Sequence, residues 1–235
     1  MRLLLLSNSK NFGGQYLAHA EDAIRTFLGA GVRTVLFVPF AAVRITWDEF
    51  TATVRRRFAD LGYALDSVHT ARDPIAAARD AEAIVVGGGN TWQLLDRLYQ
   101  TRLLPAIRER ARAGTPYIGW SAGANIAGLT IKTTNDMPIV LPPSAEALAL
   151  LPFQLNPHYT DAVIPNHAGE TRAERLLEFI AANPGVPVVG LREGSILRVE
   201  GSTLTLVGEK SARVFVSGAE PAEYPSGPSL QFLMR

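Results

Sequence analysis

Residues 117–128 are YIGWSAGANIAG. The stretch begins as an apolar strand, turns sharply at residues 119–123, and continues with small side chains in a helical pattern. A Gly-x-Ser-x-Gly pattern at a strand-to-helix junction is typical of the nucleophile elbow of serine hydrolases, in which the turn exposes the serine hydroxyl. Such a short pattern also occurs in ordinary glycine-rich turns. The rest of the sequence therefore has to decide whether Ser121 is a nucleophile.

Strands and helices alternate on the N-terminal side of this stretch and return after it. Apolar runs of the buried-strand type occur at residues 2–6, 34–40, 63–69, 83–86, 116–119 and 186–191. Segments with helical spacing occur at residues 16–28, 47–61, 91–99, 104–113 and 170–182, and Asp73-Pro74 opens a further short helix with a cap and a first-position proline. This order predicts an α/β fold, a mostly parallel sheet with helices on both faces. Ser121 and the glycines at 87–89 follow the carboxyl ends of two strands, where parallel sheets form their sites.

The second half of the chain is less regular. Residues 133–143 are typical of an ordered loop with a short strand, and residues 156–159 of a rigid irregular segment. Three short apolar runs, at residues 195–199, 203–207 and 213–216, predict a small antiparallel C-terminal strand region. We find no repeat, low-complexity tract or linker, and therefore expect one α/β domain over residues 1–235.

Composition narrows the class of protein. The 235 residues are 47% hydrophobic and 19% charged, as in an ordinary globular domain. The net charge is +1 and basic residues are scattered, which gives nucleic acid or an anionic membrane no electrostatic attraction. Cysteine is absent, which excludes disulfides and thiolate catalysis. With no secretory signal and no apolar run near the roughly 20 residues of a membrane helix, we expect a cytoplasmic protein.

A serine nucleophile needs a base that removes its proton. The sequence offers four histidines. His19 lies in a predicted amphipathic helix beside acidic residues, and His69 ends a strand without an evident partner. His158 lies in Asn-Pro-His-Tyr and His167 in Asn-His-Ala-Gly. The residues alone leave both loop histidines open, and the neighbouring proline slightly favours His158.

The base in turn needs a carboxylate that holds the correct tautomer. Asp136 lies between the serine and His158 in the chain, which matches the Ser…Asp…His order of α/β-hydrolases. Glu193 follows a predicted buried strand, which would place it at the same sheet edge as Ser121. Chain order favours Asp136 and sheet geometry favours Glu193, so both remain candidates.

Backbone amides are the expected stabilisers of an oxyanion. The amide of Ala122 follows the serine at a helix N-terminus. The GGGN stretch at residues 87–90 lacks the spacing of a dinucleotide or P-loop motif. Its glycines would let the backbone approach a substrate, which makes Gly88 and Gly89 candidate donors, with a plain tight turn as the alternative. No metal-ligand motif occurs in the sequence, and we expect hydrolysis without a metal or cofactor.

Longer motifs extend this pattern over most of the chain. They are LLLLSNS, VVGGGNTWQLL, YIGWSAGANIA, TTNDMPIV, LNPHYTDA, HAGETRAERLLEF and GLREGS. In these motifs the chain, up to about residue 195, resembles the peptidase E family of α-aspartyl dipeptidases. The resemblance implies a class I glutamine-amidotransferase-like (flavodoxin-like) fold, a preference for dipeptides with an N-terminal aspartate, and a possible homodimer. It implies Ser121 as nucleophile and His158 as base, and leaves the third member between Asp136 and Glu193.

An aspartate side chain in the substrate needs a cationic or multi-donor pocket. Arg172, near the start of a predicted helix, can hold a carboxylate with two hydrogen bonds, or else forms a surface ion pair with a nearby glutamate. Asn90 and Asn135 are candidates for the amino end or the peptide carbonyl. The expected partner is thus a small peptide. A cyanophycinase-like hydrolase of β-aspartyl-arginine units and a non-catalytic binding protein remain as alternatives.

Overall fold

The structure is a computed structural model that describes residues 1–163, 165–166 and 168–234. The strands of the first half are β1 (Arg2–Leu6), β2 (Thr34–Val38), β3 (Ala64–Ser67), β4 (Ile84–Val86) and β5 (Tyr117–Trp120). The helices of the first half are η1 (Ala18–Ala20), α1 (Glu21–Leu28), α2 (Trp47–Asp60), η2 (Val68–Thr70), α3 (Pro74–Asp80), α4 (Thr91–Gln100) and α5 (Leu103–Arg112). The second half contains α6 (Ala122–Asn125), β6 (Gln154–Tyr159), α7 (Arg172–Ala182), β7 (Val188–Arg192), β8 (Ile196–Glu200), β9 (Thr203–Val207), β10 (Ala212–Phe215), β11 (Ala222–Tyr224) and η3 (Pro228–Met234).

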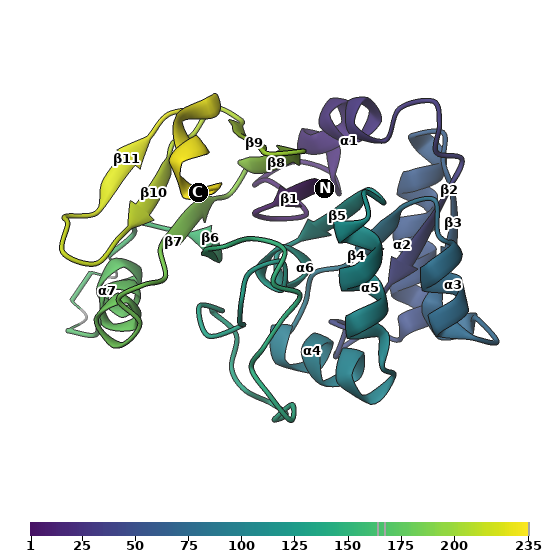
Figure 1. The fold of residues 1–235 in the computed structure, drawn as a ribbon, viewed down its shortest axis with the longest axis horizontal. Helices are drawn as coiled ribbons and strands as arrows, with labels where there is room; N and C mark the ends of the chain where they lie inside the picture. Colours follow the sequence, from purple (N-terminus) through teal and green to yellow (C-terminus); the bar gives the residue numbers. More distant parts are fainter. Residues whose placement is uncertain (164, 167, 235) are drawn as a thin grey trace.

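Among the described residues, the strands form two sheets (Figure 1). The large sheet has seven strands in the order β3-β2-β4-β5-β1-β8-β9. The first five strands are parallel to one another, β8 pairs antiparallel with β1, and β9 pairs antiparallel with β8. The small sheet has four strands in the order β11-β10-β7-β6, in which β6 and β7 are parallel. The predicted α/β fold with a mostly parallel sheet is confirmed, and the chain crosses from the small sheet to the large one between β7 and β8.

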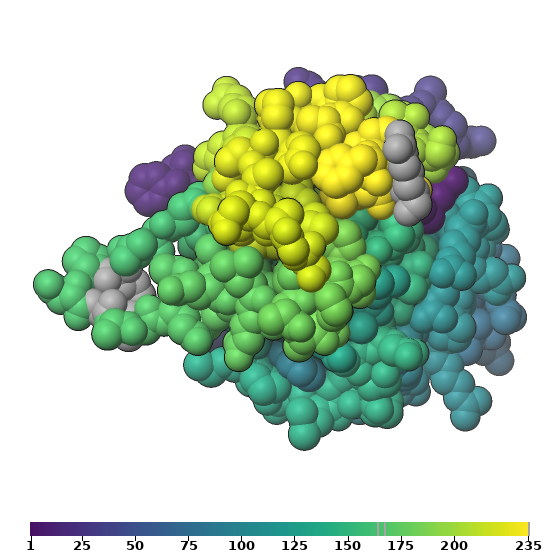
Figure 2. All heavy atoms as spheres, turned by 60° about the vertical axis from the view of Figure 1, so that its left-hand side comes forward, coloured from purple at the N-terminus to yellow at the C-terminus, as the bar shows by residue number. Residues whose placement is uncertain are grey.

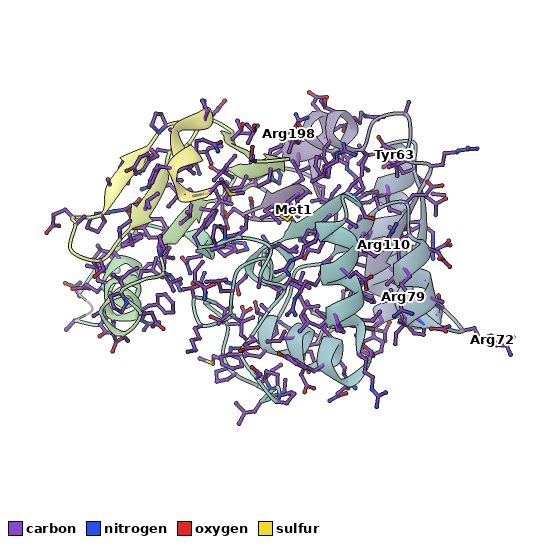
Figure 3. The ribbon with its side chains drawn as sticks, in the orientation of Figure 1. Met1, Tyr63, Arg72, Arg79, Arg110 and Arg198 are labelled. Carbon is purple, nitrogen blue, oxygen red and sulfur yellow. The ribbon has the colours of Figure 1, made fainter. Side chains whose placement is uncertain are left out.

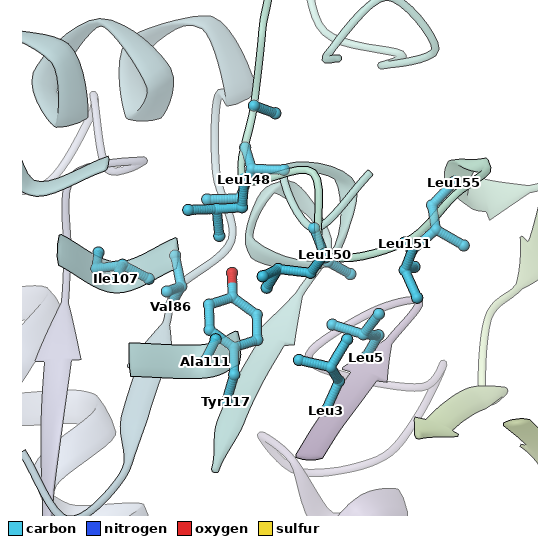
Figure 4. Close-up of a cluster of buried hydrophobic side chains, with 14 of the residues drawn as sticks. Leu3, Leu5, Val86, Ile107, Ala111, Tyr117, Leu148, Leu150, Leu151 and Leu155 are labelled. Atoms are coloured by element: carbon cyan, nitrogen blue, oxygen red, sulfur yellow. The ribbon is translucent and has the colours of Figure 1, made fainter. Parts of the chain in front are cut away.

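Helices cover both faces of the large sheet, as predicted. Along β1, Leu3 and Leu5 join one core with residues of α3, α4 and α5, whereas Leu4 and Leu6 join a second core with residues of α1 and α2. All four leucines are fully buried, because successive side chains of a strand point to opposite faces of the sheet. Figure 4 shows the first core, into which Tyr117 points from β5. The unbroken apolar run at the start of the chain is thus a central strand.

Local capping rules explain where the predicted helices begin. The Thr46 side chain accepts a hydrogen bond from the amide of Glu49 at the start of α2, and the Glu49 carboxylate accepts one from the amide of Thr46. Asp73 caps α3 by accepting hydrogen bonds from the amides of Ile75 and Ala76, with Pro74 at the first helical position. Both starts were predicted from the sequence and are confirmed. Thr171 and Glu174 form a second capping box at α7, which begins two residues later than predicted.

The charged side chains are spread over the surface. Figure 3 places Arg72, Arg79 and Arg110 near α3 and α5, on the side of the molecule away from the small sheet. Arg110 joins α5 to the residue that follows α3, because its guanidinium donates a hydrogen bond to the carbonyl of Ala81 at 3.1 Å. In the described part of the chain, no helix is long and apolar enough to span a membrane, and no three His, Cys, Asp or Glu side chains are grouped to hold a metal ion.

The second half differs from the prediction in three places. Residues 133–143 contain no strand, and residues 156–159 belong to β6 instead of an irregular segment. The three C-terminal strands do not form one antiparallel unit, because β8 and β9 extend the large sheet while β10 pairs with β7 and β11 in the small one. Such short strands are specified by packing and pairing partners far away in the sequence, which local periodicity does not contain.

The small sheet lies between α7 and the body of the molecule. One face, with Leu155 and Val189, joins the core that also covers the large sheet. On the other face, Leu176 and Ile180 of α7 pack against Phe215. Figure 2 shows the C-terminal strands and η3 on this side. The two sheets therefore share one apolar core, and the assignment of residues 1–235 to one domain stays a prediction.

Candidate active site

Ser121 lies at the end of β5 and immediately precedes α6. Its backbone is held at φ 52° and ψ −113°, a conformation rare outside glycine. A Cβ on Gly119 would lie 2.2 Å from the carbonyl oxygen of Gly123, and one on Gly123 would lie 2.2 Å from that of Val86. Only glycine fits at either position of the Gly-x-Ser-x-Gly pattern. Close backbone packing therefore forces the turn and presents the serine at its apex.

His158 comes from β6, at a β-bulge in the pairing of β6 with β7. The register shifts between Pro157 and Tyr159, and His158 has a φ of 55°. A bulge leaves one residue out of the ladder and turns its side chain. Here the imidazole reaches the large sheet, with Nε2 3.0 Å from Ser121 Oγ. The strand that the sequence analysis missed is the one that carries this histidine.

Glu193 follows β7, in the turn that leads into β8. The turn is closed by a hydrogen bond from the Ser195 amide to the Arg192 carbonyl at 3.0 Å, with Gly194 at φ 90°. The Glu193 carboxylate lies 2.7 Å from His158 Nδ1. A carboxylate only accepts, so Nδ1 carries the proton and Nε2 is free to accept from the serine hydroxyl.

The route by which Glu193 reaches this place differs from the expected one. We predicted that Glu193 follows a strand of the same sheet as Ser121. The strand before Glu193, β7, belongs to the small sheet, so the prediction that the two residues share one sheet edge is wrong. The carboxylate arrives near the serine because the chain changes sheets at this residue.

Asp136 contacts the start of α4. Its Oδ2 accepts hydrogen bonds from the Thr91 amide at 2.7 Å, from the Thr91 hydroxyl at 2.6 Å and from the Thr134 hydroxyl at 3.2 Å. A carboxylate is favourable at a helix N-terminus, where unpaired amides and the helix dipole meet it. None of its hydrogen bonds to the described residues leads to His158. The structure therefore brings Glu193, and not Asp136, into contact with the histidine.

The backbone at Gly88 and at Ala122 lies beside the serine, and Gly89 follows Gly88 with its Cα facing Ala41. A Cβ on Gly88 would lie 3.0 Å from the Cβ of Ser121, so the chain at Gly88 passes directly beside the nucleophile candidate. Ala122 is the first residue of α6. Within the described chain, the amides of Gly88, Gly89 and Ala122 donate to no protein acceptor. Unpaired donors next to a serine hydroxyl are the arrangement that an oxyanion requires.

A pocket of about 280 Å³ opens beside Ser121 and His158. Arg172, the first residue of α7, lines this pocket together with Asp136. Burial lowers the pKa of Arg172 and the nearby Arg175 adds to this effect, whereas the Asp136 carboxylate opposes it. The pocket thus holds one cation and one carboxylate close together.

Asn135 holds the guanidinium of Arg172. The Asn135 Oδ1 accepts from Arg172 Nη1 and, at 2.6 Å, from the side chain of Asn156, while its Nδ2 donates to the Pro157 carbonyl at 2.8 Å. The amide is therefore occupied at both ends. Asn135 itself also lines the pocket, and a direct contact with substrate stays a prediction.

Asn90 is the N-cap of α4. Its Oδ1 accepts from the Gln93 amide at 3.0 Å, and its Nδ2 donates to the Met137 carbonyl at 2.9 Å. These bonds fix the start of the helix that follows the glycine loop. A direct role of Asn90 in substrate binding also stays a prediction.

The other histidines have different surroundings. His69 contacts Asp48 at 3.0 Å and is held in the structure away from the site. His19, which was expected on the surface, is half-buried near Glu193, where burial lowers its pKa and the glutamate charge opposes the shift. His167 lies outside the described residues.

Two residues that contact the site were missed by the sequence analysis. Ser7 contacts the backbone of His158, and Asn8 contacts that of Gly194. The signal was present, because two small polar residues directly follow a buried strand at the carboxyl edge of the sheet.

Comparison with known proteins assigns the family. The sequence matches the model of peptidase family S51 over residues 3–207. The chain belongs to peptidase family S51. This family S51 member is therefore a serine-type peptidase, a hydrolase, and the predicted likeness to the peptidase E family is confirmed.

Full-length relatives support the same assignment. The chain is 51% identical over 233 residues to the Peptidase E of a Nostoc species, covering 99% of this chain and 96% of that protein. It is 51% identical over 235 residues to the Peptidase E of Streptomyces coelicolor, covering 100% and 95%. A crystal structure of a peptidase from an acI-B1 actinobacterium shares the fold, with a TM-score of 0.67 at 19% identity over 95% of this chain and 96% of that one. Neither alternative, the cyanophycinase-like hydrolase or the binding protein, is favoured by these relatives of the S51 peptidase.

Proposed function

We propose that this family S51 peptidase is a serine dipeptidase that hydrolyses dipeptides with an N-terminal aspartate. One observation carries the proposal: the contacts from Ser121 Oγ to His158 at 3.0 Å and from His158 to Glu193 at 2.7 Å lie beside a pocket that contains an arginine. The motif resemblance to α-aspartyl dipeptidases and the relatives named Peptidase E support the substrate class.

Acylation begins with His158 as general base. Its Nε2 takes the hydroxyl proton as Ser121 Oγ attacks the main-chain carbonyl carbon of the N-terminal aspartate. Glu193 accepts the hydrogen bond from Nδ1, holds the imidazole in the tautomer that can accept the proton, and stabilises the imidazolium that forms. Asp136 has no part in this proton transfer. It braces the start of α4, which follows the glycine loop.

The oxyanion forms next to unpaired backbone donors. The amides of Gly88, Gly89 and Ala122 receive the negative charge of the tetrahedral intermediate. His158 then gives its proton to the nitrogen of the scissile bond, the C–N bond breaks, and the second amino acid leaves while the aspartyl group stays on Ser121 as the acyl-enzyme. Water attacks the acyl-enzyme with His158 again as base, which frees the aspartate and restores Ser121.

Arg172 sets the preference for aspartate. Its guanidinium can hold the substrate β-carboxylate with two hydrogen bonds. Asn135 fixes the orientation of that guanidinium, and Asn90 fixes the loop beside it. A pocket of about 280 Å³ is small, which suits a short acidic side chain. The substrate is thus a small peptide whose first residue enters this pocket.

The test uses two substitutions and paired substrates. Ser121→Ala should abolish hydrolysis of Asp-Leu while circular dichroism shows an intact fold, since the covalent step needs the hydroxyl. Arg172→Met should raise KM for Asp-Leu at least tenfold, about 1.4 kcal/mol, because a charged partner is lost. Activity retained by Ser121→Ala, or faster turnover of a β-Asp-Arg dipeptide than of Asp-Leu, would contradict the proposal.

Two further parts of the proposal concern the setting of the enzyme. We place it in the cytoplasm and expect a homodimer. Cell fractionation tests the first, and light scattering of the purified protein tests the second.

A further inference from the structure

Ser7 connects the two sheets at the candidate site. It directly follows β1 and is fully buried. Its hydroxyl accepts a hydrogen bond from the His158 amide at 2.9 Å and donates one to the Leu191 carbonyl at 2.7 Å. Its own amide donates to the Ser195 carbonyl at 3.0 Å. One small side chain thus contacts β6 and β7, while its backbone contacts the residue before β8.

The contact is needed because of the bulge that carries the histidine. Pro157, which pairs with Leu191, has no amide hydrogen, and the register shifts directly after it. The ladder is disrupted at a bulge, so buried groups beside it need other partners. Ser7 supplies an acceptor for the His158 amide and a donor for the Leu191 carbonyl. The Ser7 hydroxyl therefore fixes the backbone of His158 at the bulge, where hydrogen bonds between β6 and β7 do not fix it.

Asn8 holds the carboxylate side in a similar way. Its Oδ1 accepts from the Gly194 amide at 2.8 Å, directly after Glu193. Its Nδ2 donates to the Lys10 carbonyl at 2.9 Å and to Asn11 Oδ1 at 2.8 Å, which fixes the orientation of the amide. Two consecutive residues thus hold the backbone of the histidine and that of the turn carrying the glutamate.

The same strand also holds the serine. β1 pairs in parallel with β5, and the Ser121 amide donates to the Leu6 carbonyl at 3.1 Å. Ser7 is the next residue along the chain. A single backbone link therefore separates the group that holds the nucleophile from the group that holds the base. The position of His158 relative to Ser121 therefore depends on the hydrogen bonds that Leu6 and Ser7 make to them.

We propose that Ser7 is a positioning residue for hydrolysis, setting the distance between the serine and the histidine through the histidine backbone. The inference rests on the proposed function for its reaction. Ser7 does not touch the pocket that contains Arg172, so its loss should act on the chemical step and not on substrate binding. A misplacement of about 1 Å in catalytic groups can lower the rate by about a hundredfold.

Kinetics of Ser7→Ala on Asp-Leu are the first test. We expect kcat to fall by about 10- to 100-fold with KM changed by less than about twofold. The rate at which a fluorophosphonate labels Ser121 should fall by a similar factor, because labelling also needs the aligned base. This second readout does not depend on the substrate. If the wild-type protein hydrolyses no aspartyl dipeptide, the proposed function fails, while the labelling rates still test Ser7.

Ser67→Ala is the matched control. Ser67 is also a buried serine at the end of a strand, and its hydroxyl lies 2.6 Å from His69 Nδ1 and 3.3 Å from the Phe37 carbonyl, away from the site. Both substitutions should lower the melting temperature, but only Ser7→Ala should lower kcat and the labelling rate. An equal loss of kcat in the two variants would show a general loosening of the fold and overturn the proposal.

A double-mutant cycle separates positioning from a merely structural role. Ser7→Ala is combined with Glu193→Gln, which removes the charge that orients the histidine. If Ser7 acts through the aligned histidine, its effect on kcat should shrink to about threefold or less in the Glu193→Gln background. An equal factor in both backgrounds, or a kcat for Ser7→Ala within about twofold of the wild type, overturns the proposal.

Discussion

The large sheet and the small sheet contribute to the site by different physical means. On the large sheet, Ser121 is placed by backbone atoms so close together that Gly119 and Gly123 admit no Cβ. From the small sheet come His158 and Glu193, whose side chains are 40% and 47% exposed and are held by hydrogen bonds. Steric constraint is independent of pH and tolerates no added atom. Polar contacts tolerate changes of shape but depend on charge.

An ionic network braces the small sheet beside the site. Arg192 contacts Asp161 at 2.6 Å and Glu223 at 2.8 Å, and its guanidinium lies 5.3 Å from the ring of Tyr159. Hydrogen bonds to Glu223, and then to Asp161, raise the pKa of Arg192. The bonds from Arg192 in turn lower the pKa of Glu223. The ends of β6 and β7 are therefore joined by charges next to the histidine and the glutamate.

The largest effect is expected where charge orients the histidine. Glu193→Gln should lower kcat for Asp-Leu by about a thousandfold, because a neutral amide no longer selects the tautomer or stabilises the imidazolium. Asp136→Asn should cost about tenfold or less, since this carboxylate caps α4 and does not contact the base. Steady-state kinetics of both variants check the difference. The reverse order would return the orienting role to Asp136.

A smaller but still large effect is expected from crowding the elbow. Gly123→Ala places a Cβ 2.2 Å from the Val86 carbonyl oxygen and should lower the free energy of unfolding by about 3 kcal/mol. Gly185→Ala is the control, because a Cβ there meets nothing within 4 Å. Urea denaturation measures both. Equal stabilities of the two variants would mean that close backbone packing does not hold the turn that carries Ser121.

The smallest effect concerns the charges of the small sheet. Glu223→Gln removes an exposed carboxylate with a lowered pKa, so the stability it contributes is present above the unfolded-state pKa of about 4.3 and is lost as the pH falls through the lower folded-state pKa. We expect the variant to be less stable by about 1 kcal/mol at pH 7, with the difference vanishing at lower pH.

Urea denaturation across this pH range measures the difference, with Glu220→Gln as control. Glu220 is exposed, and its carboxylate has no ion pair with any described residue. A Glu223→Gln difference that persists unchanged at pH 3 would assign it to packing and not to charge.

Local sequence rules predicted the large sheet well. Buried strands, the caps at Thr46 and Asp73, and the elbow at Ser121 leave patterns in a few neighbouring residues, which the sequence shows directly. The strand under His158 was missed because a Pro-His pair at a bulge has no strand periodicity. The C-terminal strands were found but their partners were not, since short strands carry no local signal of where they pair.

The sequence by itself determined the parallel α/β sheet, the turn that carries Ser121, and the set of candidate residues from which the partners of Ser121 come. The reason is that apolar periodicity, capping and the need for glycine act over a few residues. Only the tertiary structure decided between Asp136 and Glu193 as the contact of His158, and revealed Ser7 as the link between the sheets. These contacts join residues from 35 to 151 positions apart, and their distances depend on how two sheets pack on one core.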